Sequence, residues 1–199
     1  MTAKVEQSKR KSVGILGGGF NPVHIGHLVM ADQVKDQLNL DECYLMPTYE
    51  PPHVDHKKVI EADHRVEMLS LAVNGSTRLS IELAEIKRQG KSLTYDTMKA
   101  LTKSHPMTDY YFIIGGDMVE YLPKWYRIDD LLEMITFVGI KRTGYPEVSD
   151  YPIIWIDSPL IDVSSTLIRE KIKRNDSVKY LLPDNVINYI EEHQLYKGE

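Results

Sequence analysis

The sequence has a single cysteine, no long apolar run and no strong excess of either charge. Cys43 cannot form an internal disulfide, and no run approaches the roughly 18 apolar residues of a membrane span. The polar first residues, MTAKVEQSKRKS, lack the apolar stretch of a secretory signal. Lys and Arg number 24 against 29 Asp and Glu, and this net charge of −5 argues against an extended nucleic-acid surface. We therefore expect a cytoplasmic protein without membrane or nucleic-acid partners.

The length and composition are those of a globular chain. Its 199 residues suit one domain, and 42% of them are hydrophobic, in compact runs. We expect a polar tail over residues 1–11 and a single domain over residues 12–199. The sequence does not give the oligomeric state, so a homo-oligomer stays open.

Short apolar runs alternate with amphipathic stretches along most of the chain. The runs predict strands at 12–17, 42–46, 78–83, 110–114, 136–140 and 153–156. The stretches predict helices at 25–38, 62–73, 94–103 and 128–134, and two more at 165–174 and 184–193 close the chain. This alternation indicates an α/β fold, with a Rossmann-like doubly wound parallel sheet of about six strands and closing C-terminal helices. In the second helix we expect Val66, Leu69 and Val73 to face the core, and His64 and Arg65 to be exposed.

The turn after the first predicted strand, GGGFNPVHIGH at 17–27, suits an anion. Its glycines allow close approach of the backbone, and the following helix offers unpaired N–H groups. Pro22 stands where a dinucleotide fingerprint needs its third glycine. His24 and His27 are three apart and share one helix face, so both could bind one polyanion. Alternatively they are surface or capping residues, or a metal pair, for which further ligands are missing.

A second segment, DVSSTLIR at 162–169, opens the first closing helix. Ser164 or Ser165 is a natural N-cap, and capping alone is one reading of the segment. Arg169 falls near the first turn, where an exposed cation opposes the helix dipole by about 0.3–1 kcal/mol. A bound anion would offset this cost, so the segment also suits a phosphate site.

Together, these segments resemble the two motifs of the nucleotidyltransferase superfamily, G-G-x-F-N-P-x-H-x-G-H and I-S-S-T-x-I-R. Gly19 replaces the usual Thr or Ser, Val23 the usual second proline and Val163 the isoleucine. In that superfamily, the two histidines contact the phosphates of ATP and the second motif holds its β- and γ-phosphates.

Other segments are similar to bacterial nicotinate-mononucleotide adenylyltransferases. They lie at 45–53, 64–69, 85–97, 114–118, 122–126 and 141–145. Leu93 and Thr143 depart from the usual tyrosine and proline of these segments. Val54 replaces a lysine, for which Lys57 or Lys58 could substitute. No role for His53 or His56 follows from the residues.

The resemblance implies a role for each site residue, with His24 and His27 as the catalytic pair. The ATP-binding residues would be Gly18, Gly19, Phe20, His24, His27, Asp117, Arg142, Ser164, Ser165, Thr166 and Arg169. The nicotinate-nucleotide-binding residues would be Asn21, Thr94, Trp125 and Tyr126. The protein itself would hold no metal, and Mg²⁺ would arrive with ATP. On the residues alone, Trp125 could equally be core, Asp117 a helix cap and Arg142 a solvated cation.

The implied reaction transfers the adenylyl group of ATP to nicotinate mononucleotide, in NAD biosynthesis. Its products are nicotinate adenine dinucleotide and pyrophosphate. Three alternatives stay open: a nicotinamide-preferring enzyme, a phosphopantetheine adenylyltransferase and a non-catalytic nucleotide sensor. Phosphopantetheine enzymes usually lack a counterpart of Trp125, and a sensor would be expected to lose a motif histidine. Pro22 disfavours a Rossmann dehydrogenase.

Overall fold

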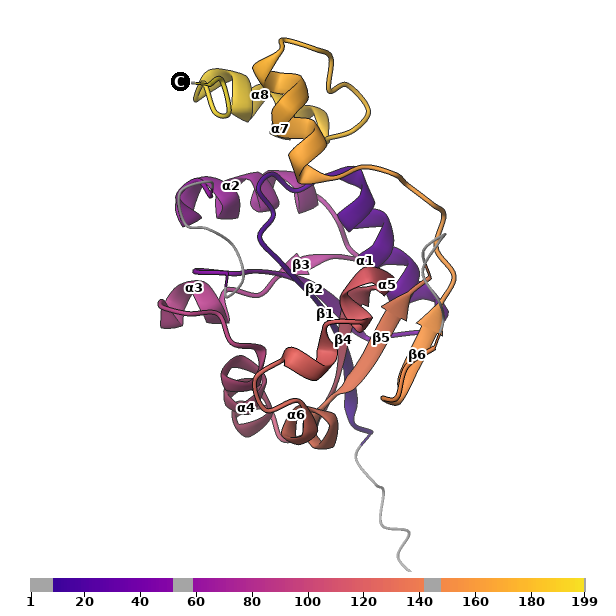
Figure 1. Cartoon of the computed structure of the whole chain (residues 1–199). Coiled ribbons are helices and arrows are strands. Elements are labelled where there is room, and N and C mark those ends of the chain that lie inside the picture. The colour runs from indigo at the N-terminus through magenta and orange to yellow at the C-terminus, as the bar shows by residue number, and fades with distance from the viewer. Residues whose placement is uncertain (1–8, 52–58, 142–147, 199) are drawn as a thin grey trace, which may run out of the picture.

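The computed structural model describes residues 9–51, 59–141 and 148–198, whose strands form one six-stranded parallel sheet (Figure 1). The strands are β1 (Lys11–Gly18), β2 (Glu42–Pro47), β3 (Ser80–Ile81), β4 (Thr108–Gly115), β5 (Thr136–Ile140) and β6 (Ile153–Ile156). Their order is β3-β2-β1-β4-β5-β6, and every pair is parallel. The predicted Rossmann-like sheet is confirmed.

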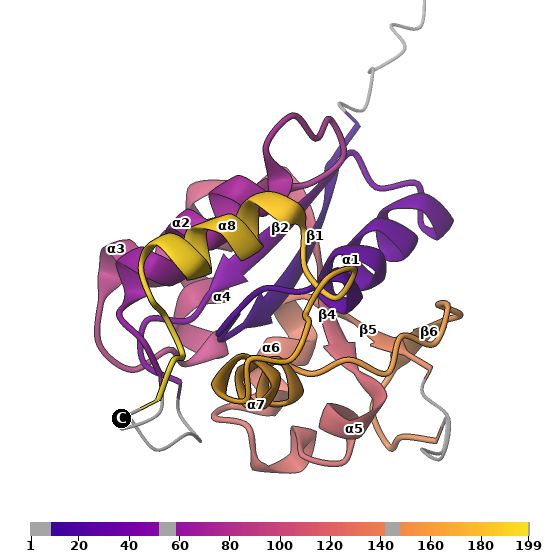
Figure 2. The same ribbon diagram turned by 90° about the horizontal axis from the view of Figure 1, so that it is seen from above.

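Helices cover both faces of the sheet (Figure 2). One face carries α1 (Ile25–Gln37), α2 (Ala62–Val73), α7 (Ser165–Lys173) and α8 (Asp184–Glu192). The other carries α3 (Ala84–Arg88), α4 (Thr94–Ser104), α5 (Gly116–Val119), the 3₁₀ helix η2 (Leu122–Lys124) and α6 (Ile128–Met134). In the described ranges, no helix is both long enough and apolar enough to cross a bilayer.

Neighbouring strand residues serve two separate cores. In β1, Leu16 packs with the α1 and α2 side and Ile15 with the α4 and α6 side. In β4, Ile113 packs with the α1 and α2 side and Phe112 with the α4 and α6 side. Successive side chains of a strand point to opposite faces, so a sheet covered on both sides needs unbroken apolar runs. This explains why the strands were visible as continuous runs in the sequence.

The predicted elements agree with the structure except where they are short. The predicted strand at 78–83 is reduced to Ser80–Ile81, because β3 lies at the sheet edge and pairs only with β2. The helices α3, α5 and η2 were not predicted. Each has five residues or fewer, which is too short to show a helical period.

Helix α2 buries most of the predicted face and two further residues beside it. Leu69 is fully buried and Val73 packs against the core as predicted, whereas Val66 is half-buried. Met68 is also fully buried, and Arg65 is only 1% exposed. Arg65 precedes Met68 and Leu69 by three and four positions, so all three share one helix face. The expected exposure of Arg65 is therefore wrong. His64 is half-buried and lies 2.8 Å from the Tyr189 hydroxyl of α8.

The strand order places a crevice at the carboxyl ends of β1 and β4. From β1 the chain continues to β2 on one side, and from β4 it continues to β5 on the other. The connections diverge at this point, where open α/β sheets bind their ligands.

Candidate active site

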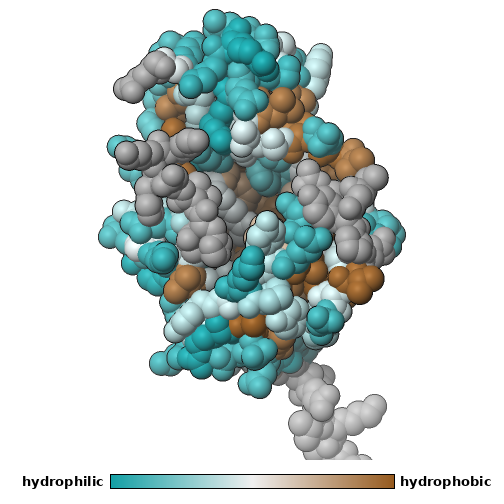
Figure 3. All heavy atoms as spheres, in the orientation of Figure 1, coloured by the Kyte–Doolittle hydropathy of each residue, from teal (hydrophilic) through white to brown (hydrophobic). Residues whose placement is uncertain are grey.

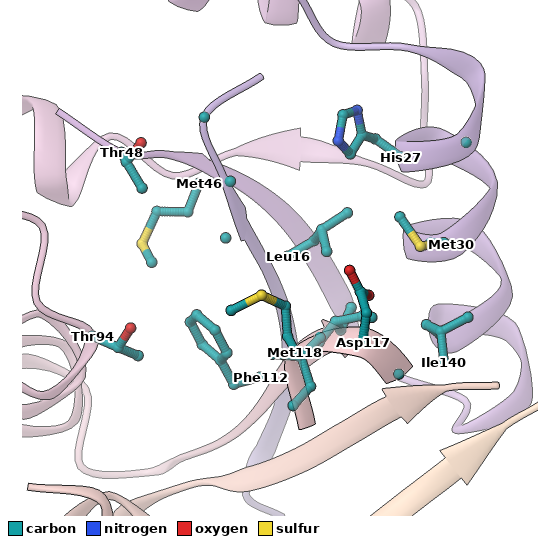
Figure 4. Close-up of a pocket in the computed structure, with 18 of the residues that line it drawn as sticks. Leu16, His27, Met30, Met46, Thr48, Thr94, Phe112, Asp117, Met118 and Ile140 are labelled. Atoms are coloured by element: carbon teal, nitrogen blue, oxygen red, sulfur yellow. The ribbon is translucent and has the colours of Figure 1, made fainter. Parts of the chain in front are cut away.

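A cavity of about 510 Å³ opens at the carboxyl ends of β1, β2, β4 and β5. Gly19, Thr48, Gly116 and Lys141 follow these four strands and line it. The close-up shows Thr48, Thr94, Asp117 and His27 around the space (Figure 4), and the surface is hollowed near the middle of the face in Figure 3. The cavity therefore coincides with the crevice that the strand order creates.

Unsatisfied polar atoms gather in this cavity. Five buried side-chain atoms of the described residues have no hydrogen-bond partner, and all five residues line it: His24 Nδ1, Thr48 Oγ1, Glu85 Oε2, Trp125 Nε1 and Ser158 Oγ. An unsatisfied buried polar atom costs about 1–3 kcal/mol. Because all five residues line one cavity, this cavity is the candidate functional site within the part of the chain that the structure describes.

The two histidines lie against each other at the start of α1. His24 is the N-cap residue, and its ring stacks on that of His27 with 3.6 Å between centroids. The backbone N–H of His24 donates to Nδ1 of His27 over 3.2 Å. In the neutral ring of His27 the proton therefore sits on Nε2. His27 points from α1 towards the end of β1 in Figure 4, so this N–H is available to a ligand there.

Burial keeps both histidines neutral at pH 7. It lowers the pKa of His24 to about 4. Burial and, secondarily, the charge of His24 hold the pKa of His27 well below its usual value. The pair thus offers hydrogen bonds rather than full charges. The capping alternative holds for His27, whose Nδ1 accepts from the N–H of His24 at the N-cap position, and both histidines line the cavity. As for a metal pair, the described residues contain no group of three His, Cys, Asp or Glu able to hold an ion.

The glycine turn borders the cavity at both of its ends but not in the middle. Gly18 and Gly19 line the cavity, whereas Phe20 and Asn21 are buried beneath it. The Phe20 ring meets the His27 ring edge-on, with centroids 4.9 Å apart. The side-chain oxygen of Asn21 accepts a hydrogen bond of 2.8 Å from the Tyr196 hydroxyl near the C-terminus. These two residues therefore support the turn from behind.

The second motif docks directly onto this turn. Ser164 is the N-cap of α7, accepting from the N–H of Leu167. Ser165 donates to the carbonyl of Pro22, and Arg169 donates to that of Asn21, each over 2.8 Å. Thr166 Oγ1 accepts a further bond from Arg169. The structure thus joins the two motifs, although none of Ser164, Ser165, Thr166 and Arg169 lines the cavity.

The residues predicted for the nicotinate ring also line the cavity. Thr94 is the first residue of α4, and Trp125 and Tyr126 follow η2. Trp125 meets Phe112 and Phe137 edge-on, with centroids 6.0 and 5.8 Å apart. Its ring is therefore both a core contact and part of the cavity wall, while its contact with the nicotinate ring stays a prediction.

Two predicted nucleotide contacts follow β4 and β5. Asp117 lies in the first turn of α5 and lines the cavity, while the N-cap position belongs to Gly115. Lys141 also lines the cavity, and its ammonium lies 3.1 Å from a carboxylate oxygen of Asp157. Arg142 falls outside the described residues, as do His53, Val54, His56, Lys57 and Lys58.

Glu85 is a cavity residue to which sequence reasoning gave no role. Its side chain is 2% exposed, and one carboxyl oxygen accepts from the Thr97 hydroxyl over 2.9 Å. Burial raises the pKa of this carboxyl. The residue opens the 85–97 segment, yet a charged residue in a five-residue helix carries no periodic signal of burial. Thr48 and Ser158 were missed for a similar reason, since both lie in loops.

Comparisons with known proteins identify the family of this chain. The cytidylyltransferase-like family model matches residues 15–171. A protein of Enterococcus faecalis named "Probable nicotinate-nucleotide adenylyltransferase" is 65% identical over 96% of this chain and 87% of its own length. One of the same name from Lactiplantibacillus plantarum is 57% identical over 99% and 93%. The chain belongs to the nicotinate-nucleotide adenylyltransferase family. This confirms the predicted family and the prediction that the protein is a nucleotidyltransferase.

Solved structures of this family share the fold. Plasmodium falciparum nicotinic acid mononucleotide adenylyltransferase superposes with a TM-score of 0.80, at 21% identity, over 95% of this chain and 98% of its own. A nicotinate-nucleotide adenylyltransferase of Vibrio parahaemolyticus, titled as putative, gives 0.71 at 17% identity, over 95% and 97%. At these identities the likeness concerns the arrangement of strands and helices.

Replacing Glu85 by Gln should stabilise the protein increasingly as the pH rises. Burial favours the protonated acid, so its pKa is higher in the folded than in the unfolded chain. The folded state then binds the proton more tightly, and stability is lost as the pH rises through the folded pKa. Gln cannot ionise and still accepts from Thr97. We expect the melting temperature of Glu85→Gln, relative to wild type, to rise between pH 5 and pH 8.

Thermal melts at several pH values would measure this difference. Glu133→Gln, on the exposed side of α6, controls for the loss of one negative charge. If the difference in melting temperature between Glu85→Gln and wild type does not change with pH, the prediction is contradicted.

Proposed function

We propose that this protein transfers the adenylyl group of ATP to nicotinate mononucleotide, releasing pyrophosphate. The observation that carries this proposal is the cavity itself, which lies at the crevice of the sheet and is lined by five residues that each hold an unpaired buried polar atom. The names of the relatives support it. So do the titles of two Plasmodium falciparum structures, which describe complexes with NaAD and with APC.

The chemistry requires positioning more than proton transfer. A phosphate oxygen of the acceptor attacks the α-phosphorus of ATP, an O–P bond forms and the bond to pyrophosphate breaks. At pH 7 the attacking phosphate is already ionised, so the step needs no general base. Catalysis then depends on aligning two anions and stabilising the charge that develops between them.

The glycine turn and the two motifs would hold ATP. Neutral His24 and His27 would donate to the α- and β-phosphate oxygens where charge builds up. The second motif would hold the leaving pyrophosphate through Ser164, Ser165, Thr166 and Arg169. Backbone N–H groups of Gly18, Gly19 and Phe20 would complete the phosphate site. Asp117 would bind the ribose hydroxyls and Arg142 the phosphate or adenosine.

The opposite end of the cavity would hold the acceptor. The indole of Trp125 offers a stacking surface for an electron-poor pyridinium ring. Thr94 begins α4, where a hydroxyl and backbone N–H groups can bind a carboxylate. Tyr126 and, through the turn, Asn21 would complete this half of the site.

Nucleotidyl transfer generally uses a divalent metal ion. We propose that Mg²⁺ enters as part of the MgATP substrate, bound by phosphate oxygens and water rather than by a set of protein ligands. We also propose that residues 12–199 act as one catalytic unit, with assembly into a homo-oligomer left to direct measurement.

Pyrophosphate release tests the acceptor directly. The purified protein would be given MgATP with nicotinate mononucleotide, nicotinamide mononucleotide or phosphopantetheine. We expect rapid release with the first, slower release with the second and none with the third. Absence of release with nicotinate mononucleotide would overturn the proposal, and release with phosphopantetheine alone would reassign the enzyme.

Removing the His27 imidazole should affect the chemical step. We expect His27→Ala to lower kcat by at least ~100-fold, the scale of losing one transition-state hydrogen bond. Steady-state kinetics would be measured alongside thermal melts. His105→Ala, an exposed histidine after α4, is the matched control and should keep the wild-type kcat. A folded His27→Ala protein with unchanged kcat would remove His27 from the mechanism.

Replacing Trp125 should weaken acceptor binding selectively. Stacking of a base on an aromatic ring contributes about 1–3 kcal/mol, so Trp125→Ala should raise the acceptor KM by ~5- to 150-fold. Trp125→Phe keeps an aromatic face and should lie between Ala and wild type. The KM for ATP serves as the internal reference. A large rise in the ATP KM with a normal acceptor KM would contradict the assignment.

A further inference from the structure

Arg65 of α2 is a buried cation that the mechanism above does not use. Its guanidinium donates four hydrogen bonds to main-chain carbonyls, at 2.9 Å to Gly19, 2.7 Å to Thr48, 3.2 Å to Tyr49 and 3.2 Å to Ile60. Burial lowers its pKa, although an arginine stays protonated in proteins. A buried charge is retained only where it is well partnered, so this arrangement needs an explanation.

The carbonyls held by Arg65 include those of the glycine turn and of the segment after β2. That segment is bonded to the loop before Thr94, since the N–H of Tyr49 donates to the Ser92 hydroxyl over 2.9 Å. Gly19 lies in the turn assigned to ATP, whereas Thr48 follows β2, and both line the cavity. The N–H of Thr48 also donates to the carbonyl of Gly18 over 2.9 Å. The guanidinium therefore joins two segments that lie 29 residues apart in the chain and continue the paired strands β1 and β2 beyond the sheet.

Fixing the Gly19 carbonyl also fixes the N–H on the other side of that peptide. In a trans peptide the C=O and N–H groups point in opposite directions. With its oxygen turned towards Arg65, the peptide between Gly19 and Phe20 presents its N–H away from Arg65. Phe20 has a φ of +45°, a conformation that residues other than glycine seldom adopt. Such a conformation persists only where surrounding contacts determine it.

We infer that Arg65 is a positioning residue, which sets the ATP-binding turn at a fixed place relative to the segment after β2. This inference rests on the proposed function, because the proposed function assigns the turn to ATP. Arg65 would touch neither substrate. Its planar fork suits the task, since separate N–H groups can reach separate carbonyls. A lysine keeps the charge but places all its donors on one atom, so it cannot bridge the two segments in the same way.

The inference predicts that kcat falls more than either KM rises. Each half of the site keeps its own contacts in Arg65→Lys, while their mutual placement becomes less precise. A misplacement of about 1 Å costs ~100-fold in rate. We expect kcat of Arg65→Lys to fall by ~10- to 100-fold, with each KM within about threefold of wild type. Arg65→Gln, which retains a planar NH₂ donor, provides a second variant if the lysine protein does not fold.

Hydrogen exchange gives a readout that does not depend on turnover. In Arg65→Lys, amides of residues 17–21 and 48–50 should exchange at least ~10-fold faster than in wild type, with the strand centres of β4 and β5 unchanged. A uniform increase over the whole chain would indicate a general loss of stability and would overturn the inference. Arg78→Lys is the control, since Arg78 pairs at the surface with Asp32 and Asp36 and should change neither exchange nor kcat.

The activity of the wild-type protein distinguishes a failure of the proposed function from a failure of the inference about Arg65. If wild type releases no pyrophosphate with nicotinate mononucleotide, the proposed function fails. If wild type is active and Arg65→Lys keeps kcat within about threefold, the inference about Arg65 fails while the function stands. A raised KM with unchanged kcat would also overturn it, because Arg65 would then act on substrate binding alone.

Discussion

The site depends on hydrogen bonds to the carbonyls of the turn after β1. Arg65 of α2 binds the Gly19 carbonyl, while Ser165 and Arg169 of α7 bind those of Pro22 and Asn21. Helices from distant parts of the chain therefore hold one short turn from two sides. Without these donors the carbonyls would be buried and unpaired, at about 1–3 kcal/mol each. With them, the start of α1 and its two histidines acquire a fixed place.

That arrangement explains why two motifs about 140 residues apart belong to one site. The polar side chains of the second motif contact the first motif, while only Val163 of this segment lines the cavity. Their hydrogen bonds within the protein are therefore structural before any ligand binds. The same side chains keep further donors, because an arginine has five N–H groups. A residue such as Arg169 can thus support the turn and still meet an anion beside it.

Much of the fold could be predicted because both sheet faces are covered, which turns the strands into continuous apolar runs. The site residues of the glycine turn could be located by the resemblance of their motif. Arg65 and Glu85 could not, since a charged residue is normally placed at the surface. Their burial depends on carbonyl and hydroxyl partners supplied by other segments. Helix spacing alone could have placed Arg65 with Met68 and Leu69, but sequence gives no sign of the partners that make its burial tolerable.

The charge of the chain shows how a polyanion site can exist in an acidic protein. A net charge of −5 disfavours an extended basic surface, yet the cavity offers donors that hardly enter that sum. His24 and His27 are neutral at pH 7 because burial lowers the pKa of each. Helix N-termini and turn amides carry only partial charges. Two anionic substrates would then be held mainly by hydrogen bonds in a partly dry space, where such bonds are strong and geometry decides the rate.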